Sequence, residues 1–268
     1  MGTAGATGPE ANVWFAVDGV AVVDGPVVGT TLGNGSEQYA TSWAGPGNSW
    51  TLTCSVASDH SADPVANLIG WVTFQNNSAA PMNFEWAIDV PLCPGVHGAS
   101  LVGGSASMTL TTVDAGSVSC YQEVPMLRAM ANDTEVGLMF TCPGSMGTSG
   151  SGNMTSTASF GTPIPSAPGP ELITVIGQRE QFTLTPGDKV KMQFNFVFQD
   201  VAIGDVPTCG ADLNGDGHIN GMDLSLMLFH WGETPECAGG IAADVDADGV
   251  VNGADLALLL NTWGPCVP

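Results

Sequence analysis

The segment Asp212-Leu-Asn-Gly-Asp-Gly-His-Ile-Asn-Gly-Met-Asp223 recurs at an offset of 32 residues as Asp244-Val-Asp-Ala-Asp-Gly-Val-Val-Asn-Gly-Ala-Asp255. A short apolar run that ends in Trp-Gly follows each copy, over residues 224–232 and 256–264. Agreement at so many polar positions indicates an internal repeat and not a biased composition. We therefore expect residues 208–268 to form a small module of two equivalent units.

Each twelve-residue segment carries oxygen ligands where a calcium loop needs them. Calcium takes six or more oxygens at about 2.3–2.6 Å, supplied from positions 1, 3, 5, 7, 9 and 12 of such a loop. The predicted ligands are Asp212, Asn214, Asp216, the carbonyl of His218, Asn220 and Asp223, and then Asp244, Asp246, Asp248, the carbonyl of Val250, Asn252 and Asp255. Gly217 and Gly249 stand at position 6, where the chain turns sharply. The repeat predicts two calcium ions.

The carboxylates of these loops have no basic neighbours in the sequence. Seven Asp side chains lie in the two loops, and no Lys or Arg occurs after Val201. Packing like charges together opposes folding, and two calcium ions would neutralise four of the seven charges. We expect the module to fold only with metal bound.

One short amphipathic helix is predicted after each loop. Apolar residues spaced i, i+3, i+4 and i+7 form one stripe per helix: Leu224, Met227, Leu228 and Trp231, then Leu256, Leu259, Leu260 and Trp263. The segments before the loops contain Pro, Gly and Cys in place of a helical pattern. This loop-helix unit without a preceding helix, present twice, resembles the type I dockerin family.

The resemblance covers the last 60 or so of the 268 residues and implies a function for them. It implies docking onto a cohesin, a β-sandwich partner on a scaffold or cell surface, through the helix faces. The candidate partner-binding residues are Gly221, Met222, Gly253, Ala254, Leu224 and Leu256. In the family the two residues before the last ligand are commonly hydroxyl-bearing, and this chain departs from that pattern. The departure favours a divergent surface receptor as an alternative partner.

The whole chain is strongly acidic and rich in turn-forming residues. Lys plus Arg number 4 against 26 Asp plus Glu, a formal charge of -22, which disfavours nucleic acid and anionic lipid as partners. Gly at 36 and Pro at 18 favour many short strands. No apolar stretch approaches the roughly 18 residues of a transmembrane helix. Cations, polysaccharides and proteins remain as partners.

Residues 1–203 are predicted to form an antiparallel β-sandwich, jelly-roll or immunoglobulin-like, because period-two apolar runs alternate with turn signals. The expected strands are 13–17, 49–57, 68–76, 82–89, 105–114, 118–123, 135–141, 171–178, 180–185 and 189–201. The segment Trp71 to Trp86 reads as a hairpin around Asn-Asn-Ser. Residues 144–170, rich in Gly, Ser, Thr and Pro, are expected to form a long loop.

Seven cysteines without a close C-x-x-C pair favour disulfides in an oxidising compartment. Cys54, Cys93, Cys120 and Cys142 allow two bridges in three connectivities. The dockerin resemblance, with a Cys-flanked module of the kind found in secreted bacterial proteins, implies a Cys209–Cys266 clip that leaves Cys237 unpaired. The expected disulfides and the dockerin resemblance imply an extracellular or cell-surface protein. No basic n-region or apolar h-region opens the chain, so we expect that a signal peptide has been removed or truncated.

Catalytic motifs for hydrolysis or nucleotide chemistry are missing from the sequence. The carboxylates weighed for a glycoside hydrolase are Glu85, Asp89, Glu123, Asp133 and Glu135. Glu85 and Asp89 lie four residues apart on one strand, roughly 13 Å, which exceeds the usual acid–base separation. Five tryptophans are candidates for stacking on sugars: Trp14, Trp43, Trp50, Trp71 and Trp86. The leading hypothesis is a non-catalytic attachment protein, with a lectin-like carbohydrate-binding module as the alternative.

Overall fold

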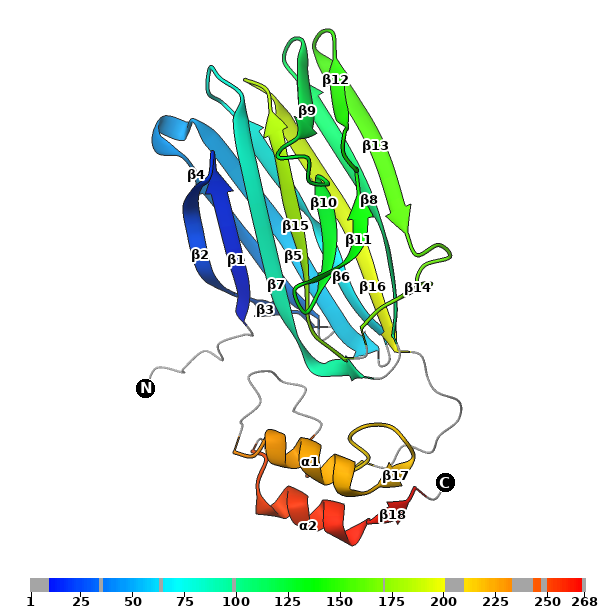
Figure 1. The fold of residues 1–268 in the computed structure, drawn as a ribbon. Helices are drawn as coiled ribbons and strands as arrows, with labels where there is room; N and C mark the ends of the chain where they lie inside the picture. The colour runs from blue at the N-terminus through cyan, green and yellow to red at the C-terminus, as the bar shows by residue number, and fades with distance from the viewer. Residues whose placement is uncertain are drawn as a thin grey trace, which may run out of the picture.

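The computed structural model describes residues 10–33, 36–62, 65–97, 100–170, 172–200, 210–232, 243–246 and 250–266. Two antiparallel sheets face each other as a sandwich, and two short helices lie in the C-terminal region (Figure 1). The predicted mainly-β class followed by a small helical module is confirmed. No described helix combines the length and apolarity needed to cross a membrane.

Each sheet has eight described strands. Sheet 1 has the order β11 (Thr134–Met139), β10 (Leu127–Ala131), β15 (Leu172–Leu184), β7 (Met82–His97), β1 (Glu10–Val17) and β2 (Val20–Val28), with β9 (Gly116–Cys120) beside β15 and β12 (Ser145–Thr148) beside β9. Sheet 2 has the order β13 (Gly152–Phe160), β8 (Ser100–Thr112), β16 (Lys189–Asp200), β6 (Val65–Asn76), β5 (Trp50–Ala62), β4 (Glu37–Ala44) and β3 (Thr30–Thr31), with β14 (Ala167–Pro168) beside β8. A 3-10 turn, η1 (Pro46–Asn48), connects β4 and β5.

Period-two alternation decides which side chains enter the sandwich core. β16 buries every second residue, as the sequence predicted: Val190, Met192, Phe194, Phe196 and Phe198. Phe182 of sheet 1 meets Phe74 of sheet 2 edge-on, with 4.9 Å between ring centroids. Such aromatic contacts between the two sheets stabilise their packing face to face.

The segment Trp71 to Trp86 is not a hairpin, contrary to the prediction. Its two strands, β6 and β7, belong to different sheets and share no ladder. Asn76, fully buried at the turn, donates to the carbonyl oxygens of Ala80 and Leu184 at 2.8 and 2.9 Å and so ties the connection to sheet 1. The chain passes here from sheet 2 to sheet 1, and each of the two strands turns its apolar face into the core between the sheets.

Residues 144–170 also differ from the prediction of a long loop, since they contain β12, β13 and β14. β13 pairs along β8 from Gly152↔Thr112 to Phe160↔Gly104, and hydroxyls of Thr109 and Thr155 lie 3.1 Å apart. Thr favours strands because its side chain is β-branched, and β13 is rich in Thr and Ser. The low-complexity composition of this segment therefore did not exclude an edge strand.

Other strand predictions were partly wrong. The segments 171–178 and 180–185 form one strand, β15, and no strand was predicted for β2, β3, β4 or β10. These missed strands lie next to sheet edges or have both faces partly polar, so they give little period-two signal.

The described cysteines of the front domain agree only in part with the expected bridges. Cys120 and Cys142 are joined by a disulfide. Cys54 is a free thiol buried in the core, and burial raises its pKa to about 12. The expectation of two bridges among the four cysteines is therefore wrong for Cys54. The side chain of Cys93, together with Cys209 and Cys237, lies outside the described part of the chain.

One carboxyl group is enclosed between the sheets. Glu180 of β15 is 1% exposed, and burial raises its pKa well above the ordinary value. The Gln178 amide, oriented so that its oxygen accepts from the Trp86 indole N–H, donates to Oε1 of Glu180 at 3.2 Å. The other carboxyl oxygen, Oε2, has no hydrogen-bond partner within the described part of the chain. Such a group is more stable protonated, because a buried charge costs more than a buried neutral acid.

Glu180 predicts that the front domain loses stability as the pH rises. The unfolded chain releases the proton near the ordinary pKa of 4.5, whereas the folded chain keeps it to higher pH. The free energy of unfolding should therefore fall by up to about 1.4 kcal/mol per pH unit above that value, until the folded group ionises. Urea unfolding followed by tryptophan fluorescence between pH 5 and 8, at constant calcium, measures this slope.

The Glu180→Gln variant cannot titrate at this position and should show a flatter slope. Glu10→Gln, which removes an exposed carboxylate of β1, is the matched control and should retain the wild-type slope. Identical slopes in all three proteins would contradict the assignment.

Candidate metal centre

The C-terminal module has a small core of its own. Its buried apolar residues form a cluster separate from that of the sandwich: Ala211, Leu213, Ile219, Met227, Ala243, Val251, Leu259 and Cys266. Ile219 and Val251, at position 8 of the two loops, are 1% and 0% exposed. Their side chains anchor both loops on the two helices, α1 (Gly221–Phe229) and α2 (Gly253–Asn261).

Each loop is closed by the segment that follows the other helix. β17 (His218–Ile219) pairs with β18 (Gly264–Pro265), and Cys266 N donates to Gly217 O at 2.8 Å. In the other half, Gly232 N donates to Val251 O at 2.8 Å. Gly232 and Gly264 occupy equivalent places after the two helices and both have positive φ. The two repeats therefore hold each other through a reciprocal pairing.

The first loop folds around its own carboxylates. Asp212 accepts backbone N–H groups from Asp216 at 3.2 Å and from Gly217 at 2.8 Å, while Asp216 accepts from His218 N at 2.8 Å. Gly217 has a φ of 82°, as expected for the sharp turn at position 6. The Asn214 side chain and, after it, the His218 N–H hold the pKa of the exposed Asp216 carboxyl below its usual range.

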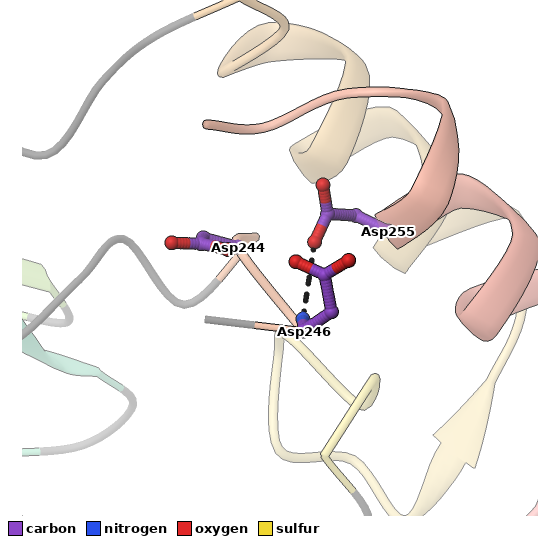
Figure 2. Close-up of side chains that lie close together, drawn as sticks. All are labelled: Asp244, Asp246 and Asp255. Carbon is purple, nitrogen blue, oxygen red and sulfur yellow. Dashed lines mark hydrogen bonds between the residues drawn. The ribbon is translucent and has the colours of Figure 1, made fainter. Parts of the chain in front are cut away.

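The second loop gathers three carboxylates. Asp244, Asp246 and Asp255 each offer one oxygen within 4.8 Å of the others. Figure 2 shows Asp255 at the start of α2 facing Asp246, whose backbone N–H donates to it at 3.1 Å. Asp244 and Asp255 are buried, whereas Asp246 is exposed. Burial by itself raises the pKa of Asp255, but backbone N–H groups of Asn252, Asp246 and Val245 bring that pKa below its ordinary value.

This donor set fits a hard divalent cation. Two oxygens bound to one calcium ion at about 2.4 Å lie at most about 4.8 Å apart, which matches the separation in the second loop. Asp223 and Asp255, at position 12, are both fully buried and join the loop to the following helix. Asp223 accepts from Leu213 N at 2.9 Å and from Asn220 N at 2.8 Å. Ionised carboxylates held in place by backbone N–H groups are ready to coordinate such an ion.

Two of the predicted ligands also cap the helices that follow their loops. Asn220 and Asn252 act as N-caps, because their side-chain oxygens accept from Met222 N and Ala254 N, both at 2.8 Å. Their side-chain amides donate to the carbonyls of His218 and Val250, two further predicted ligands. Asp248 and Gly249 lie outside the described residues. The capping role was not predicted, although Asn followed by Asp three residues later is a capping-box signal.

The predicted apolar stripes are only half buried. Met227 and Leu259 are fully buried, and Leu224 and Leu256 pack partly against the same core. The remaining members of the two stripes are exposed: Leu228, Trp231, Leu260 and Trp263. Met222, Leu226, Phe229 and Leu258 are exposed as well, Phe229 at 78%. Of the predicted partner-binding residues, Gly221, Met222, Gly253 and Ala254 are exposed, while Leu224 and Leu256 are not.

Cys266 is disulfide-bonded, and its predicted partner Cys209 lies outside the described residues.

In the front domain, most of the carboxylates considered for catalysis pair with arginine. Asp89 and Asp133 contact Arg179, and Glu135 contacts Arg128. Trp50 and Trp86 are core residues, which leaves Trp14, Trp43 and Trp71 partly exposed.

Comparison with known proteins identifies the C-terminal module. Residues 210–262 match the family model described as dockerin type I domain, which confirms the resemblance noted in the sequence. No curated protein matches the chain.

Similarity to solved structures is weak. TmCBM61, solved in complex with β-1,4-galactotriose, is 14% identical over 56% of this chain and 88% of its own, with a TM-score of 0.26. The enzymatically active domain of tailspike protein 4 of bacteriophage CBA120 is 10% identical over 59% of this chain and 19% of its own, with a TM-score of 0.25. A chain from the structure of infectious bursal disease virus, Gx strain, is 11% identical over 76% of this chain and 58% of its own, with a TM-score of 0.16. Scores this low carry no argument about the front domain.

Asp246 gives the cleanest test of the metal centre, because its exposed side chain contributes to the cluster without filling the core. The Asp246→Asn variant removes one negative charge at nearly constant shape. We expect calcium uptake at this loop to weaken at least about tenfold, or about 1.4 kcal/mol, as measured by isothermal titration calorimetry. Asp24→Asn makes the same charge change on exposed β2 and should bind calcium like the wild type. Equal affinities in both variants would remove Asp246 from the site.

Proposed function

We propose that the protein is a secreted, non-catalytic attachment protein, held to a surface or assembly by its C-terminal dockerin domain in a calcium-dependent way. The observation that carries this proposal is the match of residues 210–262 to dockerin type I domains, together with the carboxylate cluster in the second loop. Two calcium ions, one in each loop, would be bound by the twelve predicted ligands. A cohesin or a divergent surface receptor would be the partner.

Exposed apolar side chains on both helices support a docking role. Phe229 and Met222 of the α1 segment are 78% and 63% exposed, and Leu260 of α2 is 53% exposed. Clusters of exposed apolar residues on a small domain are typical of protein–protein interfaces. Because the two repeats are equivalent, Leu228 and Trp231 of one recur as Leu260 and Trp263 of the other. The partner would therefore meet similar apolar groups on either helix.

The bound ions would supply charge neutralisation and no chemical reaction. Asp223 and Asp255 belong at once to the metal loops and to the capping boxes of α1 and α2. Metal binding would hold these residues in place and with them the first turn of each helix. The docking surface would therefore depend on calcium. An extracellular location agrees with this dependence and with the Cys120–Cys142 disulfide, because disulfides persist in oxidising compartments.

Binding to purified cohesin domains tests the proposal. The wild-type protein, immobilised by its N-terminus for biolayer interferometry, should bind at least one cohesin in calcium and none in excess chelator. Phe229→Asp places a charge in the apolar surface of α1 and should weaken binding by tenfold or more, about 1.4 kcal/mol.

Val20→Asp is the matched control, since Val20 is 68% exposed on β2 in the front domain. It should bind like the wild type. Binding that survives the chelator, or that both substitutions weaken equally, would be incompatible with calcium-dependent docking through α1.

A further inference from the structure

A hollow of about 320 Å³ lies on the outer face of sheet 1. Its floor is Ala87 of β7, which faces away from the core because its neighbours Trp86 and Ile88 point inward. The strand register places Trp14 of β1 and Arg179 of β15 directly opposite Ala87 on its two sides. A small side chain between two large ones produces the depression.

The hollow is closed along β7 as well. Glu85 and Asp89 lie two residues before and after Ala87 and therefore share its face, roughly 6.6 Å away on either side. Across the strands, Trp14 and Arg179 stand roughly 10 Å apart, two interstrand spacings. Arg128 of β10 follows Arg179 in the same row. Larger side chains thus border Ala87 on all four sides.

Both arginines of the chain line this one hollow. The protein has only four Lys and Arg residues and a formal charge of -22, so this placement is unusual. The arginines are nevertheless neutralised. Arg179 makes two hydrogen bonds of 2.7 and 2.8 Å to Asp89, and Arg128 pairs with Glu135 at 2.7 Å. The hollow is therefore polar but has no excess positive charge with which to attract an anion.

Two polar groups of the hollow have no partner among the described residues. The carboxylate of Glu85 accepts no hydrogen bond and forms no ion pair within the described part of the chain. Arg128 Nε is buried and lacks an acceptor. A ligand hydroxyl that enters the hollow can donate to the carboxylate of Glu85. The half-buried indole of Trp14 adds an apolar wall beside these groups.

We propose that this hollow binds one ring of a neutral polysaccharide. The C–H face of the sugar packs on the Trp14 indole, and one hydroxyl donates to Glu85. Arg128 lines the hollow beside them. The Arg179–Asp89 pair holds the walls in place. Acidic sugars are disfavoured, because a carboxylate in the ligand would meet Glu85 and the negative field of the whole chain. The front domain thus has a ligand of its own, independent of the C-terminal loops.

Affinity gel electrophoresis of the full-length protein tests the site. The probes are soluble xylan, mixed-linkage β-glucan, galactomannan and galactan, with polygalacturonate as the acidic probe and calcium present throughout. At least one neutral polysaccharide should retard the wild type, and polygalacturonate should not. Trp14→Ala should weaken that retardation tenfold or more, and Glu85→Gln should weaken it at least threefold.

Trp71→Ala is the matched control, because Trp71 is a partly exposed tryptophan on the outer face of sheet 2. It should bind like the wild type, and circular dichroism should give the same spectrum for all variants. The proposal is overturned if no neutral polysaccharide retards the protein, if polygalacturonate alone does, or if Trp71→Ala loses as much affinity as Trp14→Ala. Release of reducing sugars that Glu85→Gln abolishes would instead make the hollow an active site and overturn a purely binding role.

Discussion

Repulsion between carboxylates is the constraint on which the C-terminal module of this protein depends. Asp244, Asp246 and Asp255 bring oxygens within 4.8 Å of one another, and no Lys or Arg follows Lys191 in the chain. Backbone N–H groups offset part of this crowding, and a cation from solution would offset more of it. Since Asp255 also caps α2, the same carboxylate connects ion occupancy to helix order. The proposed attachment through the helices is therefore a property of the protein together with its ions.

Charge is divided differently in the front domain. There both arginines form ion pairs with acidic residues on the outer face of sheet 1. The result is a locally balanced surface on a very acidic molecule, next to the indole of Trp14. The C-terminal module thus has clustered carboxylates that can bind metal ions. The front domain has paired charges around a hollow that suits an uncharged ligand.

The acidic cluster of the second loop could be predicted from sequence, because the spacing of candidate ligands within twelve residues is local. The apolar face of β16 could be predicted for the same reason, because apolar and polar residues alternate within that one strand. Alternation does not say which sheet a strand joins, so β6 and β7 were mistaken for a hairpin. The hollow could not be found either, since Trp14, Ala87, Arg179 and Arg128 are brought into one row only by strand register. The exposed half of each helix stripe could not be predicted, because helical spacing does not say how much of a stripe the core of a small module covers.

The reciprocal pairing of loops and helix ends bears on how the module arose. Gly264 closes the first loop and Gly232 belongs to the closure of the second, so each repeat completes its neighbour. A single repeat alone would leave these backbone groups unpaired and would remove the other repeat's residues from the shared core around Ile219 and Val251. A one-copy ancestor would recover both contacts as a symmetric homodimer. Tandem duplication would then have fused the two subunits into one polypeptide, which explains why the copies have kept the same length and the same closing glycine.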